Sequence, residues 1–284
     1  MTALVRTLAR PRVIPGFGIT LGYTLTYLGI IVLLPLAAVV ARSAGMGWHD
    51  FIAIISAPRT IHALWLSFGA AFIAALIDAV FGFLVAWVLV RYRFPGRRLI
   101  DAMIDLPFAL PTAVAGIALV AIYGGNGILG PYFEQIGIRV AYSPIGIVVA
   151  MTFIGLPFVV RAVQPVIEQL DQRLEEAASS LGATRGFTFR KVIFPAVMPA
   201  LLTGFAMALA RGIGEYGSVI FIAGNIPNMS EIAPLLIVIR LEEFNYNGAT
   251  AIATTMLVIS FVMLLIVNLL QAWSRKRSGH TEGA

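Results

Sequence analysis

The sequence predicts an all-α protein that crosses a membrane several times. Of its 284 residues, 59% are hydrophobic and only 12% are charged, and the mean hydropathy is +0.91. Soluble domains carry about 25% charged residues, so this chain has too little polar surface for a water-soluble core of its size. The absence of cysteine excludes a disulfide framework, thiol catalysis and cysteine-bound metal. The composition therefore predicts one transmembrane domain over residues 1–284.

Six stretches of the chain are long and apolar enough to cross a bilayer as helices, which takes about 20 residues each. The charge-poor stretches that define them contain only three charged residues, Asp78, Arg211 and Glu215. We therefore expect six transmembrane helices, at residues 17–41, 63–90, 102–123, 144–163, 197–223 and 249–272.

The first two spans are both expected to stay in the membrane. Arg6, Arg10 and Arg12 precede the first span, as they would the core of a signal peptide. Its apolar run is longer than the roughly 7–15 residues of such a core, and no convincing cleavage site follows, so we expect a retained helix. In the second span, Asp78 is expected to hydrogen-bond a neighbouring helix, and a role in transport is the alternative.

The third span contains two prolines. Pro107 and Pro111 each remove a backbone hydrogen-bond donor, and the ALPTAVAG segment around them consists of small, flexible residues. A broken or kinked helix and close helix packing through small residues are both open interpretations. Asp101 and Asp105 lie at the start of this span. Acidic side chains suit a helix N-terminus, so we expect them to cap it.

A long polar segment, residues 166–195, joins the fourth and fifth spans. Apolar residues recur in it at spacings of three and four and share one helical face: Ile167, Leu170, Leu174, Ala178 and Leu181. Gly182 is the expected end of this helix, because glycine adopts the left-handed conformation at low cost. A second short helix should follow over residues 184–191, before Pro195 and Pro199 bend the chain back. The segment is either a docking surface for another protein or an amphipathic connector in the membrane interface.

The fifth span contains an arginine and a glutamate four residues apart, Arg211 and Glu215, which therefore lie on one helix face. An arginine in mid-span costs about 2.5–3.5 kcal/mol on insertion scales, so it usually faces a partner or a water-filled cavity. Arg211 either lines an anion pathway, with Glu215 fixing its orientation, or forms a structural ion pair that holds helices together.

The positive charges predict the orientation of the chain in the membrane. Fifteen of the Lys and Arg residues lie on the side of the two termini, and four lie in the opposite loops. The excess places both termini in the cytoplasm, with the loops at residues 42–61, 124–142 and 225–248 outside. The net charge is +6, and the basic residues that produce it flank apolar runs. We therefore expect contact with membrane lipid and no nucleic-acid partner.

Residues 176–195, EAASSLGATRGFTFRKVIFP, resemble the EAA loop of ABC importer permeases. The motif's Glu-Ala-Ala, glycine and proline correspond to residues of this chain, whereas Val192 and Phe194 stand where the motif has Ile and Leu. In that family the loop docks into a groove on a nucleotide-binding subunit. The resemblance implies a site of coupling to an ATPase at Glu175, Glu176, Ala177, Ala178, Gly182, Ala183 and Pro195.

The chain itself has no phosphate-binding loop, which would need Gly-Lys-Ser/Thr. Its two lysines, Lys191 and Lys276, each follow an arginine. We therefore expect a non-catalytic subunit without a cofactor of its own, and ATP and Mg on a partner ATPase. A membrane-embedded enzyme ranks last, because no acids, histidines or hydroxyls converge at a spacing that suggests a reaction.

Three further segments resemble one group of these importers: RYRFPGRR at residues 91–98, DLPFALPTAVAG at 105–116 and RGIGEYGSVIFIAGN at 211–225. They are similar to the T-type permease subunit of bacterial sulfate/thiosulfate ABC importers. The resemblance implies a type I importer fold in the bacterial inner membrane. It also implies three kinds of partner: a W-type permease, two ATPase subunits and an external sulfate-binding protein.

The prolines of the third span and the charges of the fifth are candidates for lining a translocation pathway: Pro107, Pro111, Thr112, Arg211 and Glu215. Two alternatives stay open. The G-E-[FY]-G and A-G-N elements also occur in molybdate and tungstate permeases. An ion-coupled secondary transporter would use Asp78 with Arg211 and Glu215 as a relay and would need no ATPase.

Overall fold

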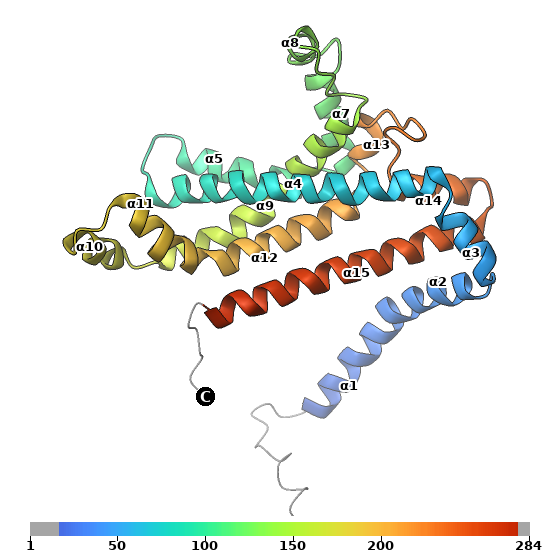
Figure 1. The fold of residues 1–284 in the computed structure, drawn as a ribbon, viewed down its shortest axis with the longest axis horizontal. Coiled ribbons are helices and arrows are strands. Elements are labelled where there is room, and N and C mark those ends of the chain that lie inside the picture. Colours follow the sequence, from blue (N-terminus) through green and yellow to red (C-terminus); the bar gives the residue numbers. More distant parts are fainter. Residues whose placement is uncertain (1–16, 278–284) are drawn as a thin grey trace, which may run out of the picture.

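The computed structural model describes residues 17–277, and all regular structure in this part of the chain is helical. This confirms the predicted all-α class. Arg6, Arg10 and Arg12, which contribute to the predicted orientation, lie outside the described residues. Figure 1 shows long helices that lie lengthwise beside one another, with shorter helices at their two ends.

The N-terminal helix is long but is hardly covered by the rest of the chain. It comprises α1 (Phe17–Leu28), one π-helical turn η1 (Gly29–Leu33) and α2 (Leu34–Ala44). No residue of α1 is buried, whereas α2 packs against α15 (Tyr246–Arg277). The short helix α3 (Trp48–Ile55) then returns the chain towards the bundle.

The core is formed by α4 (Pro58–Arg91), α9 (Pro144–Gln169) and α12 (Phe194–Ile213). Small residues let these helices approach closely: a Cβ added at Gly82 or at Gly204 would clash with Val159. Such packing through glycine and alanine is typical of helix association in membranes, where no hydrophobic effect drives the helices together.

Within the described residues 17–277, five helices are long and apolar enough to cross a membrane: residues 17–44, 58–91, 144–169, 185–213 and 246–272. They correspond to five of the six expected spans. The third expected span, residues 102–123, is divided among α5 (Arg97–Ile104), α6 (Leu106–Ala109) and α7 (Thr112–Tyr123). The fifth expected span ends earlier than predicted, because α12 ends at Ile213 and α13 (Val219–Ile222) follows after a turn. The count of six crossings therefore stays a prediction.

The polar loop that is expected in the cytoplasm lies at one end of the molecule. In Figure 1, α10 (Gln172–Ser180) and α11 (Arg185–Thr188) lie where α4 and α9 end, and α3 and α14 (Ala233–Glu242) lie at the opposite end. From the middle of the bundle, α7 rises at a steep angle and carries α8 (Gly130–Gln135). This grouping agrees with the predicted sides, and the orientation in the bilayer stays a prediction.

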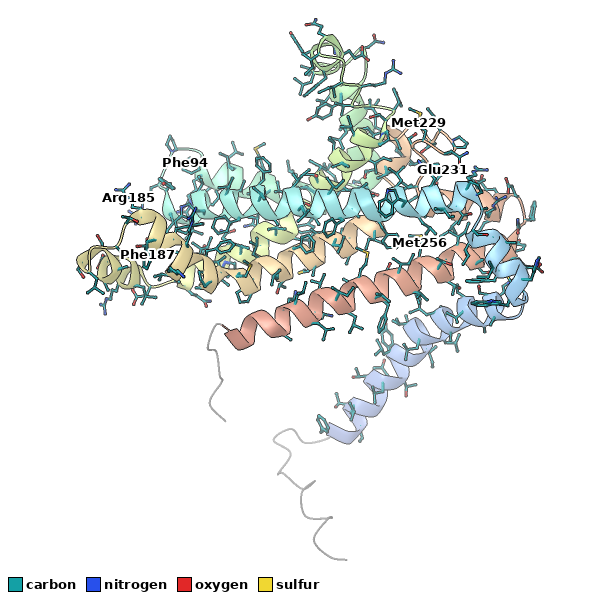
Figure 2. The ribbon with its side chains drawn as sticks, in the orientation of Figure 1. Phe94, Arg185, Phe187, Met229, Glu231 and Met256 are labelled. Atoms are coloured by element: carbon teal, nitrogen blue, oxygen red, sulfur yellow. The ribbon has the colours of Figure 1, made fainter. Side chains whose placement is uncertain are left out.

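A bidentate ion pair stabilises the end of the bundle opposite α10. Arg59 donates from Nε and Nη2 to the two carboxylate oxygens of Glu231, each at 2.7 Å. The Glu231 side chain is only 1% exposed. Figure 2 shows Glu231 beside the start of α4, far from Arg185 and Phe187. The pair therefore joins α4 to the segment before α14.

We expect Glu231→Gln to lower the free energy of unfolding by about 3–5 kcal/mol, because the substitution removes one partner of a buried charge pair. The measurement is thermal unfolding of the purified subunit in detergent. Glu243→Gln is the matched control, because its exposed pair with Arg240 should contribute less than about 1 kcal/mol. Equal effects of the two substitutions would contradict the structural role of Glu231.

Candidate coupling and translocation sites

The coupling loop has the predicted order of helix, glycine corner and helix. Asp171 caps α10 by accepting a hydrogen bond from the backbone N–H of Arg173. At the other end of α10, Gly182 has φ +81°, and its N–H donates to the Ser179 carbonyl at 2.9 Å. Thr184 then caps α11 through the Phe187 N–H. The predicted glycine corner is confirmed.

The predicted apolar face of this loop is wrong as a continuous helical face. The chain leaves helical geometry at Leu170, so Ile167 belongs to α9 and is buried there. Leu174 lies in α10 and Leu181 directly follows it. Their side chains are 50% and 88% exposed. Phe187 on α11 is 57% exposed. The loop thus presents apolar side chains outward.

The second helix of the loop is also longer than predicted. From Arg185 the chain continues through the π-helical turn η2 (Phe189–Ile193) directly into α12. Pro195 lies directly after η2, at the start of α12, and Pro199 lies further along the same helix. The two prolines do not interrupt the helix, which runs as one segment over residues 185–213.

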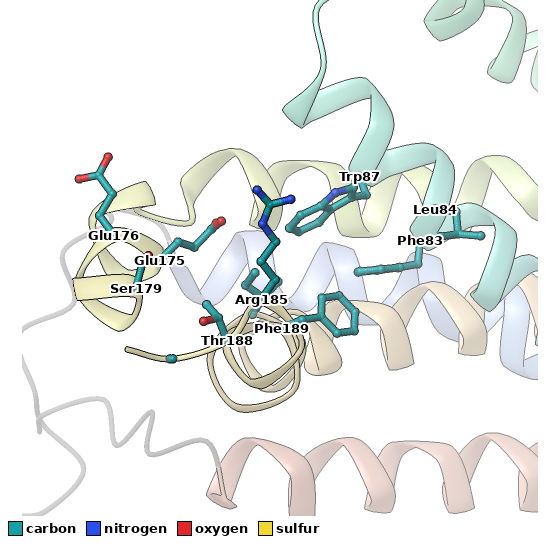
Figure 3. Close-up of a pocket in the computed structure, with 11 residues that line it drawn as sticks. Phe83, Leu84, Trp87, Glu175, Glu176, Ser179, Arg185, Thr188 and Phe189 are labelled. Carbon is teal, nitrogen blue, oxygen red and sulfur yellow. The ribbon is translucent and has the colours of Figure 1, made fainter. Parts of the chain in front are cut away.

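Two neighbouring glutamates of the loop differ in their surroundings. The Glu175 carboxylate accepts from Arg91 Nη2 at 2.6 Å. Glu176 is exposed, and Figure 3 shows its carboxylate directed away from Glu175 and Arg185. Both border a cavity of about 590 Å³ between α10 and α4, whose apolar wall consists of Phe83, Leu84, Trp87, Phe189 and Ile193.

The two expected pathway segments are both breaks between helices. Between α6 and α7, Leu110 and Pro111 are extended, with ψ of 135° and 133°. Between α12 and α13, residues 214–218 form a turn. The helix break, which was one of the two open interpretations of the proline segment, is therefore present.

The two breaks lie against each other. A Cβ added at Gly116 on α7 would clash with the backbone of Ser218. A Cβ added at Gly217 would clash with the side chain of Thr112. Both interpretations of the ALPTAVAG segment therefore apply, because the helix is broken and its small residues also pack closely.

An ion pair stabilises the turn between α12 and α13, which is the second of the two breaks. Arg211 Nη1 lies 2.6 Å from Glu215 Oε2. The other oxygen, Oε1, accepts from both the N–H and the Oγ–H of Ser218 at 2.9 Å. The Glu215 side chain is 2% exposed and that of Arg211 is 34% exposed. The contacts of Glu215 all lie within this one segment, so both interpretations of the pair stay open, and Arg211 is accessible from outside the subunit.

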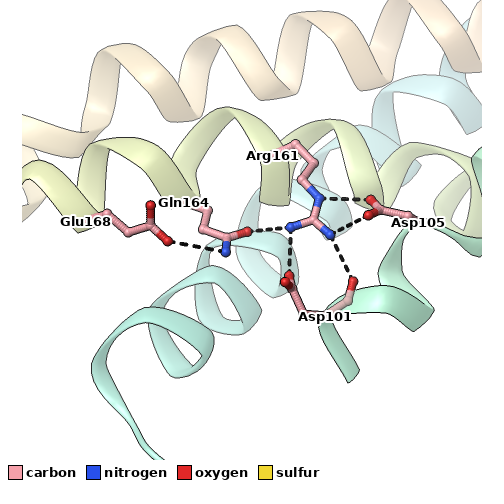
Figure 4. A network of polar contacts seen from close by, with 5 residues as sticks. All are labelled: Asp101, Asp105, Arg161, Gln164 and Glu168. Atoms are coloured by element: carbon pink, nitrogen blue, oxygen red, sulfur yellow. Dashed lines mark hydrogen bonds and ion pairs between the residues drawn. The ribbon is translucent and has the colours of Figure 1, made fainter. Parts of the chain in front are cut away.

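Arg161 on α9 is the centre of a polar network that Figure 4 shows. Its guanidinium donates to both Asp105 carboxylate oxygens at 2.8 and 2.6 Å and to Asp101 Oδ1 at 2.7 Å. The expected capping role of Asp101 is wrong, because Asp101 lies within α5. Asp105 stands at the N-cap position of α6 but makes no side-chain cap hydrogen bond there. The network instead holds the segment before the first break against α9.

Asp78 is buried in α4, and neither carboxylate oxygen has a hydrogen-bond partner within the described part of the chain. A Cβ added at Gly155 on α9 would clash with this carboxylate. The expected hydrogen bond to a neighbouring helix is therefore wrong.

The profile of a known family, the binding-protein-dependent transport system inner membrane component, matches residues 78–280. The chain belongs to this family. It is 48% identical over 270 residues to the sulfate transport system permease protein CysT of Salmonella typhimurium, covering 95% of this chain and 98% of that protein. It is also 48% identical to a probable sulfate transport system permease protein of Nephroselmis olivacea, with 90% of each chain covered.

The fold of this permease is also similar to that of solved transporters. A bacterial ABC transporter involved in the import of the acidic polysaccharide alginate has a TM-score of 0.74 at 16% identity, covering 90% of this chain and 94% of the other. The MetNI methionine ABC transporter has a TM-score of 0.59 at 16% identity, covering 75% and 95%. The family match contains the coupling loop and both helix breaks, whereas α1 to α3 precede it.

Three polar contacts of the permease were missed by sequence reasoning: Arg59–Glu231, Arg91–Glu175 and the Arg161 network. Their partners lie 172, 84 and 56–60 residues apart in the sequence. No local spacing rule connects such residues. An arginine near the predicted end of a span was the one signal present in each case.

Proposed function

We propose that this chain is the membrane-spanning subunit of an ATP-driven importer that moves sulfate or thiosulfate into the cytoplasm. The observation that carries the proposal is the 48% identity to a sulfate transport system permease over 95% of the chain. The coupling loop supports it, because a transporter driven by its own ion gradient would not need a docking surface for an ATPase.

The ATPase docks on α10, the Gly182 corner and α11 in this proposal. Leu181 and Phe187 supply exposed apolar contacts, and Glu176 supplies a charge with no partner among the described residues. Ala177 is exposed and Ala178 and Ala183 are half-buried, so small side chains leave the surface of the loop open to close approach. ATP and Mg bind the partner, and the permease is a non-catalytic subunit.

The translocation pathway follows the exposed face of α12 towards the two breaks. Thr203, Met207 and Arg211 recur at a spacing of four and lie on this face, and all three are at least partly exposed. Thr203 and Met207 border a cavity of about 450 Å³ that Phe108 of α6 and Arg161 also line. A cationic arginine on such a face suits an anionic substrate, and lipid would be an unfavourable neighbour for it.

The assembly that this proposal requires contains a W-type permease, two ATPase subunits and an external sulfate-binding protein in the bacterial inner membrane. The exposed α12 face would contact the W-type permease, so that the pathway lies between the two subunits. The outer loops would receive the binding protein, and both termini would lie in the cytoplasm.

Reconstitution of this assembly in vesicles tests the substrate. We expect the complex to take up radiolabelled sulfate or thiosulfate when the matching binding protein is present. Uptake of molybdate or tungstate in place of sulfate would overturn the substrate assignment while leaving the coupling role in place.

A further inference from the structure

The two adjacent glutamates of α10 have different partners. Glu175 is bound to Arg91, whose side chain is only 12% exposed and whose guanidinium lies 5.3 Å from the centre of the Trp87 ring. Glu176 has no hydrogen bond or ion pair among the described residues and points outward. The same helix therefore presents one carboxylate to its own subunit and the other to its surroundings.

Packing alone does not join α10 to α4. A cavity of about 590 Å³ lies between them, bordered by Trp87, Glu175 and Ser179. Phe189 fills part of the gap through edge-on ring contacts with Phe83 and Trp87, but it belongs to η2 on the α12 side of the loop. Among the described side chains, the Arg91–Glu175 pair is the one polar contact from α10 to a long helix.

Arg91 is well placed to pass movement inwards. It is the last residue of α4, a helix of 34 residues that packs along α9 and α12 in the core. The charge-assisted hydrogen bond of 2.6 Å fixes both the distance and the relative orientation of the Arg91 and Glu175 side chains. The Trp87 ring holds the guanidinium in place by a cation–π contact. A displacement of α10 along this bond displaces the end of α4.

We propose that the Arg91–Glu175 pair is the connection through which movement of the docked ATPase reaches α4, whereas Glu176 keeps the ATPase contact of the proposed function. This inference rests on the proposed function of the loop. It assigns Glu175 a positioning role within the permease, in place of the ATPase contact expected from the sequence.

Transport measurements on the reconstituted complex separate the two roles. With Glu175→Gln, the ATPase still co-purifies and hydrolyses ATP, but the sulfate imported per ATP hydrolysed falls roughly fivefold or more, the lower range of coupling between two sites. With Glu176→Gln, less ATPase co-purifies. The matched control is Glu168→Gln, an exposed carboxylate on α9 whose one contact among the described residues is a long 3.5 Å bond from Gln164.

The exchange Arg91→Glu with Glu175→Arg distinguishes coupling from simple stability. The pair is restored in reverse, so most of the import per ATP should return. The proposal would be overturned if Glu175→Gln left the sulfate imported per ATP hydrolysed unchanged. It would also be overturned if the double exchange assembled into the complex but did not restore this ratio.

A second measurement does not depend on transport. The chain has no cysteine, so Leu181→Cys, at a side chain that is 88% exposed, accepts a single spin label. We expect the label to become more mobile in the Glu175→Gln permease than in the wild type and to stay unchanged with Glu168→Gln. Equal mobility in all three would overturn the connection even if sulfate import itself is confirmed.

Discussion

Replacing Gly116 by alanine should destabilise the permease by about 1–3 kcal/mol or more and remove most sulfate uptake, because the added methyl group meets the backbone of Ser218. Backbone atoms cannot rotate away as a side chain can, so α7 must separate from the second break. The measurements are uptake by the reconstituted complex and thermal unfolding of the subunit. Gly69→Ala on α4 is the control, because no atom lies within 4 Å of the added group.

Gly217→Ala refines the same prediction. Its methyl group meets the Thr112 side chain, so the double variant with Thr112→Ala should recover much of the lost uptake. The same Thr112→Ala change should not rescue Gly116→Ala. If Gly116→Ala transports as well as Gly69→Ala, the close approach of the two breaks is not needed for transport.

Gly182→Pro should abolish the coupling of ATP hydrolysis to uptake. Proline holds φ near about −65°, whereas the corner requires the left-handed region, with φ +81°. Proline also lacks the N–H that donates to Ser179. The end of α10 must therefore unwind, and the docking surface loses its shape. The measurement is ATP hydrolysis stimulated by the loaded binding protein, together with uptake.

Gly182→Asn is the matched control, because asparagine tolerates the left-handed region better than other side chains and keeps the N–H. We expect it to retain most of both activities. Stimulated hydrolysis and uptake that are untouched by proline would rule out the coupling role of this corner.

Much of the fold followed from the distribution of charge along the chain. Five of the expected spans correspond to long apolar helices, because a bilayer-spanning helix must avoid charge over its whole length. The Gly182 corner also followed from local chemistry, since few other residues adopt its backbone geometry. The chain's resemblance to ABC importer permeases located the loop itself.

The helix breaks and the ion pairs needed the structure. The prolines of the third span signalled a break, but nothing at residues 214–218 distinguished a turn from a continuing helix. The role of Asp105 was misjudged because its partner, Arg161, lies 56 residues further along the chain. Long-range contacts of this kind depend on how the helices pack, which residue spacing does not reveal.

Measuring which energy source drives sulfate uptake is the most direct test of the proposed function. The complex is placed in vesicles with ATP on the side of the coupling loop and with the loaded binding protein on the other side. We predict sulfate uptake that requires ATP and the ATPase and that persists when every ion gradient is abolished. Uptake by the isolated permease, driven by an ion gradient without ATPase, would contradict its assignment to an ATP-driven importer.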